Sequence, residues 1–103
     1  LTNAVFMPYV LIKNRKIIEE KIILLSKYMG LKNYSFESFI KWILEIRSEL
    51  DIPNTTKEIN IDPNDFEKLS KMALADPSTA SNPLKLNEED FLNLYKDSYY
   101  GNL

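Results

Sequence analysis

The sequence predicts an all-α fold, a bundle of five or six helices that forms a single domain over residues 1–103. Apolar residues recur at spacings of three and four along most of the chain, and no segment sustains the alternation that a strand requires. Residues that begin or end helices flank most of these stretches. With 103 residues, 45% of them hydrophobic and 27% charged, the chain can bury one modest core.

The first segment, residues 1–12, contains no charged residue. Read as a helix, it is apolar in every direction and must be buried on all sides. It is shorter than the roughly 20 residues that span a membrane, Pro8 interrupts it, and no basic residue precedes it as in a signal peptide. We expect a core helix whose start and packing partners lie upstream, in a cytoplasmic chain that is not bound to membranes. The opening residue, Leu1, fits a truncated product.

Two longer helices are expected next. Residues 15–29 repeat apolar side chains at helical spacing, and Gly30 is a good residue to end the helix. Within this helix Ile23 falls on the polar face, either by tolerance or as a second contact surface. Ser35 can cap a third helix, which ends before Pro53. The predicted apolar stripes consist of Ile18, Ile22, Leu25 and Met29, widened by Ile17, Leu24 and Tyr28, and then of Phe36, Phe39, Ile40, Ile43, Ile46 and Leu50.

The second half of the chain predicts two shorter helices. Asp62 can cap the first of them, because Pro63 then occupies the first turn, where a missing N–H costs nothing. Residues 78–86 are proline-rich and polar, which predicts a loop. Asn87 caps the last helix, which ends at Gly101, and three acidic residues follow that cap at the positive end of the helix dipole.

The composition excludes several kinds of chemistry. There is no cysteine and no histidine, which removes thiolates, the commonest general base and the commonest transition-metal ligand. Two glycines cannot form a phosphate-binding loop. The net charge of −2 is spread in mixed sign without a basic stripe, so we expect no binding to nucleic acid. The sequence therefore predicts no catalytic, metal-binding or cofactor-binding residue within this chain.

The carboxylates have structural explanations. Residues 88–90 lie at a helix N-terminus, and Glu19 and Glu20 lie on a solvated face. Asp62 begins a stretch like a calcium-binding loop, but Phe66 stands where an oxygen ligand is needed and no glycine follows. We expect no calcium site there.

Four stretches resemble the iron-containing (group III) alcohol dehydrogenases. The run Asn3-Ala4-Val5-Phe6-Met7-Pro8-Tyr9-Val10 resembles a family segment that directly follows a His-Gly pair. Residues 18–31 resemble the family's next helix. Residues 50–55 resemble its Leu-Gly-Ile-Pro turn, with Asp51 in place of the glycine, and residues 72–83 resemble a late signature that ends in Asn-Pro. The resemblance keeps the family's order and spacing over essentially all 103 residues.

This resemblance implies a parent enzyme in two parts. An upstream α/β domain would bind NAD or NADP, and a helical C-terminal domain would hold iron, or zinc, on an aspartate and three histidines. The metal polarises the alcohol or carbonyl oxygen while hydride moves to or from the nicotinamide. All four metal ligands would lie upstream of residue 1, so we expect a C-terminal fragment that is inactive alone and that has the upstream part as its partner.

The resemblance also suggests residues that support the site. Asn3 and Ala4 would open the helix after the last histidine ligand and position that ligand through packing. Ser78 occupies a position where many members carry a cysteine near the substrate pocket. The loop that begins with Ser78 and Thr79 either lines this pocket or is a plain connection between helices. Leu84 stands where the family often has a basic residue, which argues against a polar role for that position.

An alternative is a stand-alone helical module that binds a protein partner through residues 1–12. Large apolar side chains left in water each cost roughly 1.5–3 kcal/mol. We therefore also expect a homodimer through this segment that buries Phe6, Met7 and Val10.

Overall fold

The computed structural model describes residues 2–103, except for the side chains of Thr2 and Ser78. Over this part of the chain it contains α-helices, short 3-10 helices and no strand, which confirms the predicted all-α fold. The elements are α1 (Thr2–Lys13), α2 (Arg15–Tyr28), α3 (Phe36–Glu49), η1 (Thr56–Ile59), η2 (Pro63–Asp65), α4 (Phe66–Ala75), η3 (Pro77–Ser81) and α5 (Glu88–Tyr100). No helix among them is long and apolar enough to cross a membrane.

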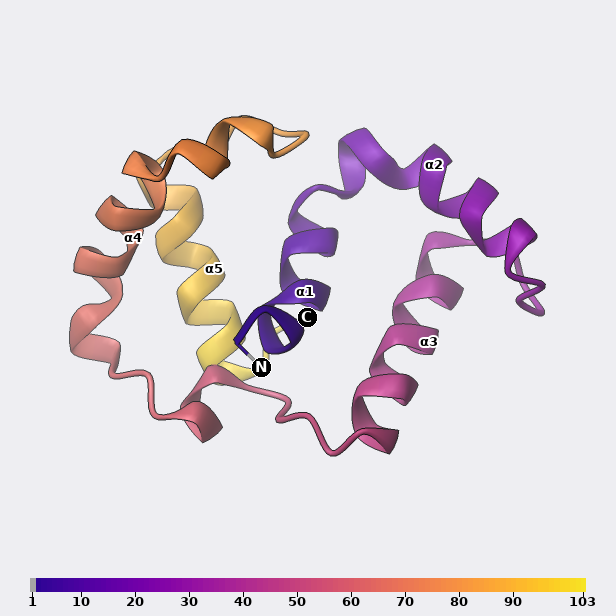
Figure 1. Ribbon diagram of the computed structural model, residues 1–103, viewed down its shortest axis with the longest axis horizontal. Helices are drawn as coiled ribbons and strands as arrows, with labels where there is room; N and C mark the ends of the chain where they lie inside the picture. Colours follow the sequence, from indigo (N-terminus) through magenta and orange to yellow (C-terminus); the bar gives the residue numbers. More distant parts are fainter. Residues whose placement is uncertain (1) are drawn as a thin grey trace.

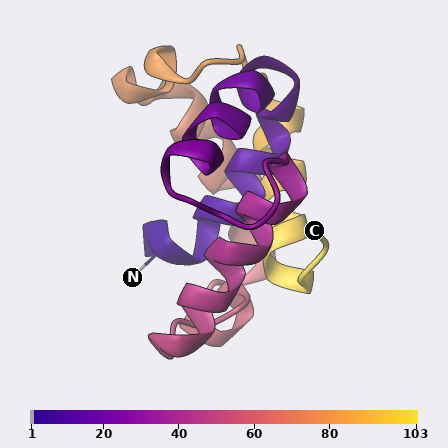
Figure 2. The same ribbon diagram turned by 90° about the vertical axis from the view of Figure 1, so that its right-hand side faces the viewer.

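Helix α1 lies between two pairs of helices (Figure 1). On one side α2 packs against α3, and on the other α4 packs against α5. Helix α1 contacts α2, α3 and α5, and η1 contacts both α1 and α5. The molecule is elongated, with extents of 41 × 29 × 20 Å along its principal axes. Figures 1 and 2 show this arrangement from two perpendicular directions.

The core consists of two clusters of buried apolar side chains. The larger cluster joins α2 to α3 through Ile22, Phe36, Phe39, Ile40 and Ile43. The smaller one joins α1 to α5 and the segment before it through Tyr9, Leu86 and Leu94. The position of α1 between these clusters follows from its sequence, because a helix without charges in its first eleven described residues has no face suited to water.

Burial of α1 is confirmed on most of its circumference. Val5, Pro8 and Tyr9 are buried, whereas Met7 is 45% exposed. The expectation that its packing partners lie upstream is wrong for these residues, because α2, α3, α5 and η1 of the same chain cover them.

The apolar stripe predicted for α2 is only partly correct. Ile22 is buried, but Leu25, Met29, Ile17, Leu24 and Tyr28 are all exposed, and Ser26 is fully buried instead. The Ser26 hydroxyl donates to the Ile22 carbonyl oxygen at 2.9 Å, so this small polar side chain has a hydrogen-bond partner within α2 and can be buried. Among the described residues, helix α2 packs mainly against α3 and α1, which cover a narrower face than the sequence stripe.

The predicted caps are confirmed where the structure describes them. Ser35 and Asp62 accept hydrogen bonds from the backbone amides of Ser38 and Asn64. Asn87 forms a reciprocal capping box with Asp90, and Gly101 adopts the left-handed conformation that ends α5.

The loop predicted over residues 78–86 is wrong at its beginning, where η3 forms a short 3-10 helix. Pro77 fits its first turn, and the Thr79 amide donates to the Asp76 carbonyl oxygen at 3.0 Å. The remainder of this segment contains no helix or strand.

Candidate hollow between α1, α4, η3 and α5

A hollow of about 360 Å³ lies where α1, α4, η3 and α5 meet. We call its apolar and aromatic lining the floor, and its three other polar residues, Asn3, Asp76 and Thr79, the rim. It is lined by Asn3, Phe6, Val10, Ala73, Asp76, Thr79, Phe91, Leu94 and Tyr95. We refer to it below as the α1–α5 hollow.

Aromatic packing fixes the floor of the α1–α5 hollow. The rings of Phe6 and Tyr95 meet edge to face with centroids 5.4 Å apart, and Tyr95 stacks on Phe66 at 6.2 Å. Such pairs contribute about 0.5–1.5 kcal/mol beyond their buried area. Burial raises the pKa of the Tyr95 phenol above its ordinary value.

The rim formed by η3 is held to α4 by a side-chain hydrogen bond. The Thr79 hydroxyl donates to the Ala73 carbonyl oxygen in the last turn of α4, which also accepts from the Asp76 amide at 3.3 Å. Thr79 therefore joins η3 to the last turn of α4 and also lines the hollow.

A pair of asparagine amides ties this rim to the junction of α1 and α2. Asn14 Nδ2 donates to Asn82 Oδ1 at 2.9 Å, and Asn82 Nδ2 donates to Asn14 Oδ1 at 2.8 Å. Asn82 Nδ2 also donates to the Leu84 carbonyl oxygen at 2.5 Å. Asn14 is only 3% exposed, so this pair satisfies a buried polar group. The structural role of Asn14 was not predicted, because nothing in the local sequence indicates its distant partner.

The structure brings together two of the four residues predicted to support a site. Asn3 and Thr79 line the α1–α5 hollow. Ala4 does not, because it lines a different hollow of about 290 Å³ between α1 and α3, beside Met7. The side chain of Ser78 lies outside the described part of the structure. The role of all four residues stays a prediction.

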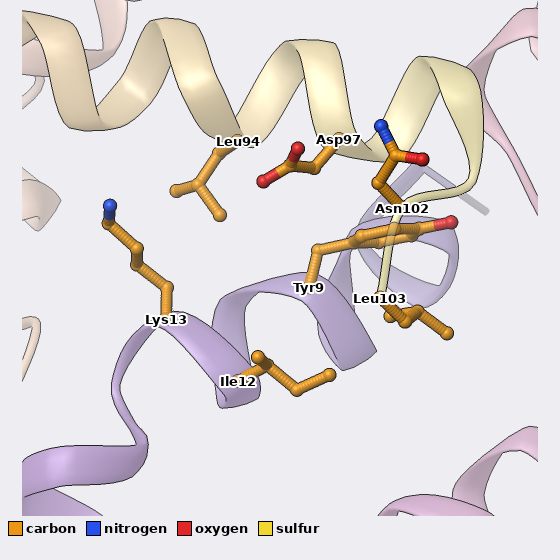
Figure 3. A pocket seen from close by; sticks show the side chains of 7 residues that line it. All are labelled: Tyr9, Ile12, Lys13, Leu94, Asp97, Asn102 and Leu103. Atoms are coloured by element: carbon orange, nitrogen blue, oxygen red, sulfur yellow. The ribbon is translucent and has the colours of Figure 1, made fainter.

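A smaller hollow of about 230 Å³ lies between α1 and the end of α5 (Figure 3). Figure 3 shows Tyr9, Lys13 and Asp97 around it, with Leu94 between them. Two of its polar side chains have structural partners: the Tyr9 hydroxyl donates to the Asn54 carbonyl oxygen at 2.8 Å, and Lys13 pairs with Asp90 at 3.0 Å. Burial raises the pKa of Tyr9, against the opposing effect of the neighbouring Arg47 charge.

The fold and the α1–α5 hollow define an all-helical domain with a largely apolar hollow between its helices. Comparison with known proteins identifies the class. Residues 1–99 match the family described as "Fe-containing alcohol dehydrogenase family, C-terminal". The chain therefore belongs to this family, as the resemblance predicted.

Individual relatives agree with this assignment. The chain is 31% identical to the NADPH-dependent butanol dehydrogenase of Clostridium saccharobutylicum, over 96% of this chain and 28% of that protein. It is 30% identical to the choline dehydrogenase of Bacillus subtilis, over 90% of this chain and 24% of that protein. It is 25% identical to the 1,3-propanediol dehydrogenase of Citrobacter freundii, over 96% of this chain and 27% of that protein. The chain thus spans about a quarter of the length of these relatives.

The metal that the family name implies has no fitting site among the described residues. They contain no group of three or more histidine, cysteine, aspartate or glutamate side chains that could hold a metal ion. The full sequence has neither histidine nor cysteine, which leaves only oxygen donors, whereas iron sites in proteins commonly use imidazole.

Proposed function

We propose that this chain is the C-terminal helical part of an iron-dependent, NAD(P)-linked alcohol dehydrogenase that interconverts alcohols with aldehydes or ketones. We further propose that the α1–α5 hollow is one wall of its substrate pocket. The observation that carries this proposal is that Asn3 and Thr79, distant in the sequence, line one hollow with an aromatic floor. The proposal places the metal (iron or zinc), the nicotinamide and the residues that bind them in an upstream part, which would be the partner of this chain, in the cytoplasm.

The contribution of this chain to such a pocket would be shape, exclusion of water and orientation. Phe6, Leu94 and Tyr95 offer an apolar surface to the carbon chain of a small alcohol. The amide of Asn3 and the hydroxyl of Thr79 offer polar groups at the rim. Hydride transfer and polarisation of the oxygen would come from the nicotinamide and the metal when they are bound.

A chimaera tests this proposal. Residues 1–99 would replace the corresponding C-terminal segment of the Clostridium saccharobutylicum butanol dehydrogenase. We expect butanol-dependent reduction of NADP by the chimaera and none by the relative's upstream part alone. Within the chimaera, Thr79→Val should raise KM for butanol by roughly tenfold, the effect of losing one hydrogen bond of ordinary strength. Thr55→Val, which lies outside the hollow, is the matched control.

A chimaera that is helical, binds NADPH and contains iron, yet oxidises no alcohol, would separate this chain from dehydrogenase function. An equal effect of Thr79→Val and Thr55→Val would leave the enzyme assignment intact and remove the hollow from the substrate pocket.

Homodimer formation through residues 1–12 stays a prediction, as does the stand-alone module that binds a protein partner. Phe6 packs against Tyr95 of its own chain and Val10 lines the α1–α5 hollow, so Met7 is the large side chain that such a dimer would cover. Sedimentation of the chain and of a Met7→Lys variant tests it: a dimer that becomes a monomer on substitution is expected, and a monomer in both contradicts it.

A further inference from the structure

Pro8 lies within α1 and leaves this helix one hydrogen bond short. Proline has no N–H, so the Ala4 carbonyl oxygen lacks the amide donor that the residue four positions later provides in a regular helix. The proline ring also pushes against that carbonyl, which bends helices. The first turn of α1, beside the N-terminus, is seen nearly end-on in Figure 1, whereas the rest of α1 rises in the plane of the picture. Pro8 is fully buried, so this break lies inside the protein.

Arg47 of α3 places a cationic side chain at this break. Its Nη1 donates to the carbonyl oxygen of Val5, the residue after Ala4, at 3.4 Å. Ala4 and Arg47 line the same apolar hollow between α1 and α3. The guanidinium therefore donates a hydrogen bond to α1 at Val5, next to Ala4, whose carbonyl oxygen has no amide donor because residue 8 is a proline.

The burial of Arg47 needs an explanation of this kind. The residue is 5% exposed, and among the described residues it forms no ion pair and its Nε has no hydrogen-bond partner. A buried charge without a counterion is unfavourable unless other groups compensate it. The Val5 carbonyl oxygen provides part of this compensation, because a charged donor forms the stronger kind of hydrogen bond.

We propose that Arg47 is a positioning residue that ties the first turns of α1 to α3 across the Pro8 break. These turns carry Asn3 and Phe6, so Arg47 holds one wall of the α1–α5 hollow through the backbone of Val5, without touching the hollow itself. The tie between α1 and α3 stands on the contacts above, and only its importance for a substrate rests on the proposed function.

Amide hydrogen exchange, measured by NMR on the 103-residue chain, tests this tie. Arg47→Met removes the donor and places an apolar side chain of similar length among apolar neighbours, a replacement that folded proteins often tolerate. We expect the Phe6 and Met7 amides to exchange roughly tenfold faster, as for the loss of one hydrogen bond from a charged donor. The Leu11 and Ile12 amides, beyond Pro8, should keep their rates. Arg47→Lys should recover part of the protection.

The Pro8→Ala substitution separates a positioning role from general stability. It returns an amide donor to the Ala4 carbonyl oxygen, so the first turns of α1 should depend less on the hydrogen bond from Arg47 to Val5. In that background Arg47→Met should change the exchange of the Phe6 and Met7 amides much less. Arg15→Met, which alters an arginine on the surface of α2, is the matched control and should leave the Phe6 and Met7 amides unchanged.

Two results would overturn the proposal: unchanged exchange in Arg47→Met, or an equal effect with and without Pro8. If Arg47→Met alone does not fold, the double variant decides, because recovery of the helical signal by Pro8→Ala supports the tie and continued unfolding refutes it. None of these measurements uses enzymatic activity, so an inactive chimaera would refute the proposed function and leave this inference standing.

Discussion

The Asn14–Asn82 pair offers the clearest test of how the η3 rim is held. Asn82→Ala removes both reciprocal hydrogen bonds and the one to the Leu84 carbonyl oxygen. It leaves the amide of Asn14, 3% exposed, without its partner. Each buried polar group stranded in this way costs about 1–3 kcal/mol, so the free energy of unfolding should fall by about 2–4 kcal/mol. For a domain of this size the melting temperature should then fall by roughly 10 to 25 °C.

Urea denaturation followed by circular dichroism measures this change. The matched control is Asn93→Ala on the exposed face of α5, which should be neutral or slightly stabilising because alanine favours helix. Adding Asn14→Ala to Asn82→Ala should cost less than the sum of the single effects, since no amide is then stranded. Strict additivity, or an Asn82→Ala variant as stable as Asn93→Ala, would contradict a stabilising role of the Asn14–Asn82 pair.

Three further predictions concern charge, the α1–η1 contact and cofactors. The Asn87 amide and then Lys13 hold the pKa of Asp90 below its ordinary value of 3.8. This depressed pKa contributes stability that is present above pH 3.8 and is lost as pH falls through the folded-state pKa. The urea midpoint should therefore fall on acidification, and it should fall less steeply in the Asp90→Asn variant. Equal slopes in the two proteins would contradict this role of Asp90. Tyr9→Phe removes the hydrogen bond to the Asn54 carbonyl oxygen and should lower the free energy of unfolding by about 1 kcal/mol in the same assay; an unchanged midpoint would show that this bond adds nothing. The isolated chain should bind neither NAD(P) nor iron tightly, and calorimetric titration with micromolar affinity would refute this.

Features that depend on a few neighbouring residues were predictable from the sequence. The caps at Ser35, Asp62 and Asn87 depend on side chains that reach the backbone within three residues. The left-handed end of α5 at Gly101 depends on a residue without a Cβ. Each is therefore contained in its own sequence window.

Features that depend on distant partners were not predictable in the same way. The stripe of α2 shows which residues are apolar, but the burial of Ser26 and the exposure of Leu24 depend on where α3 lies around the helix. Asn14 follows a helix of apolar residues as an ordinary junction residue, and only its contact with Asn82 makes it a structural group.

The candidate site shows the same limit within a single helix. Asn3 and Ala4 are adjacent in the sequence and the family resemblance treats them alike, yet successive residues of an α-helix point about 100° apart, since 3.6 residues complete a turn. On a helix covered from one side only, one of the two would face the solvent. Helix α1 has neighbours on both sides, so Asn3 reaches the hollow beside α4 and α5, whereas Ala4 reaches the one beside α3. A substitution at Ala4 should therefore act on the Arg47 tie, and one at Asn3 on the α1–α5 hollow.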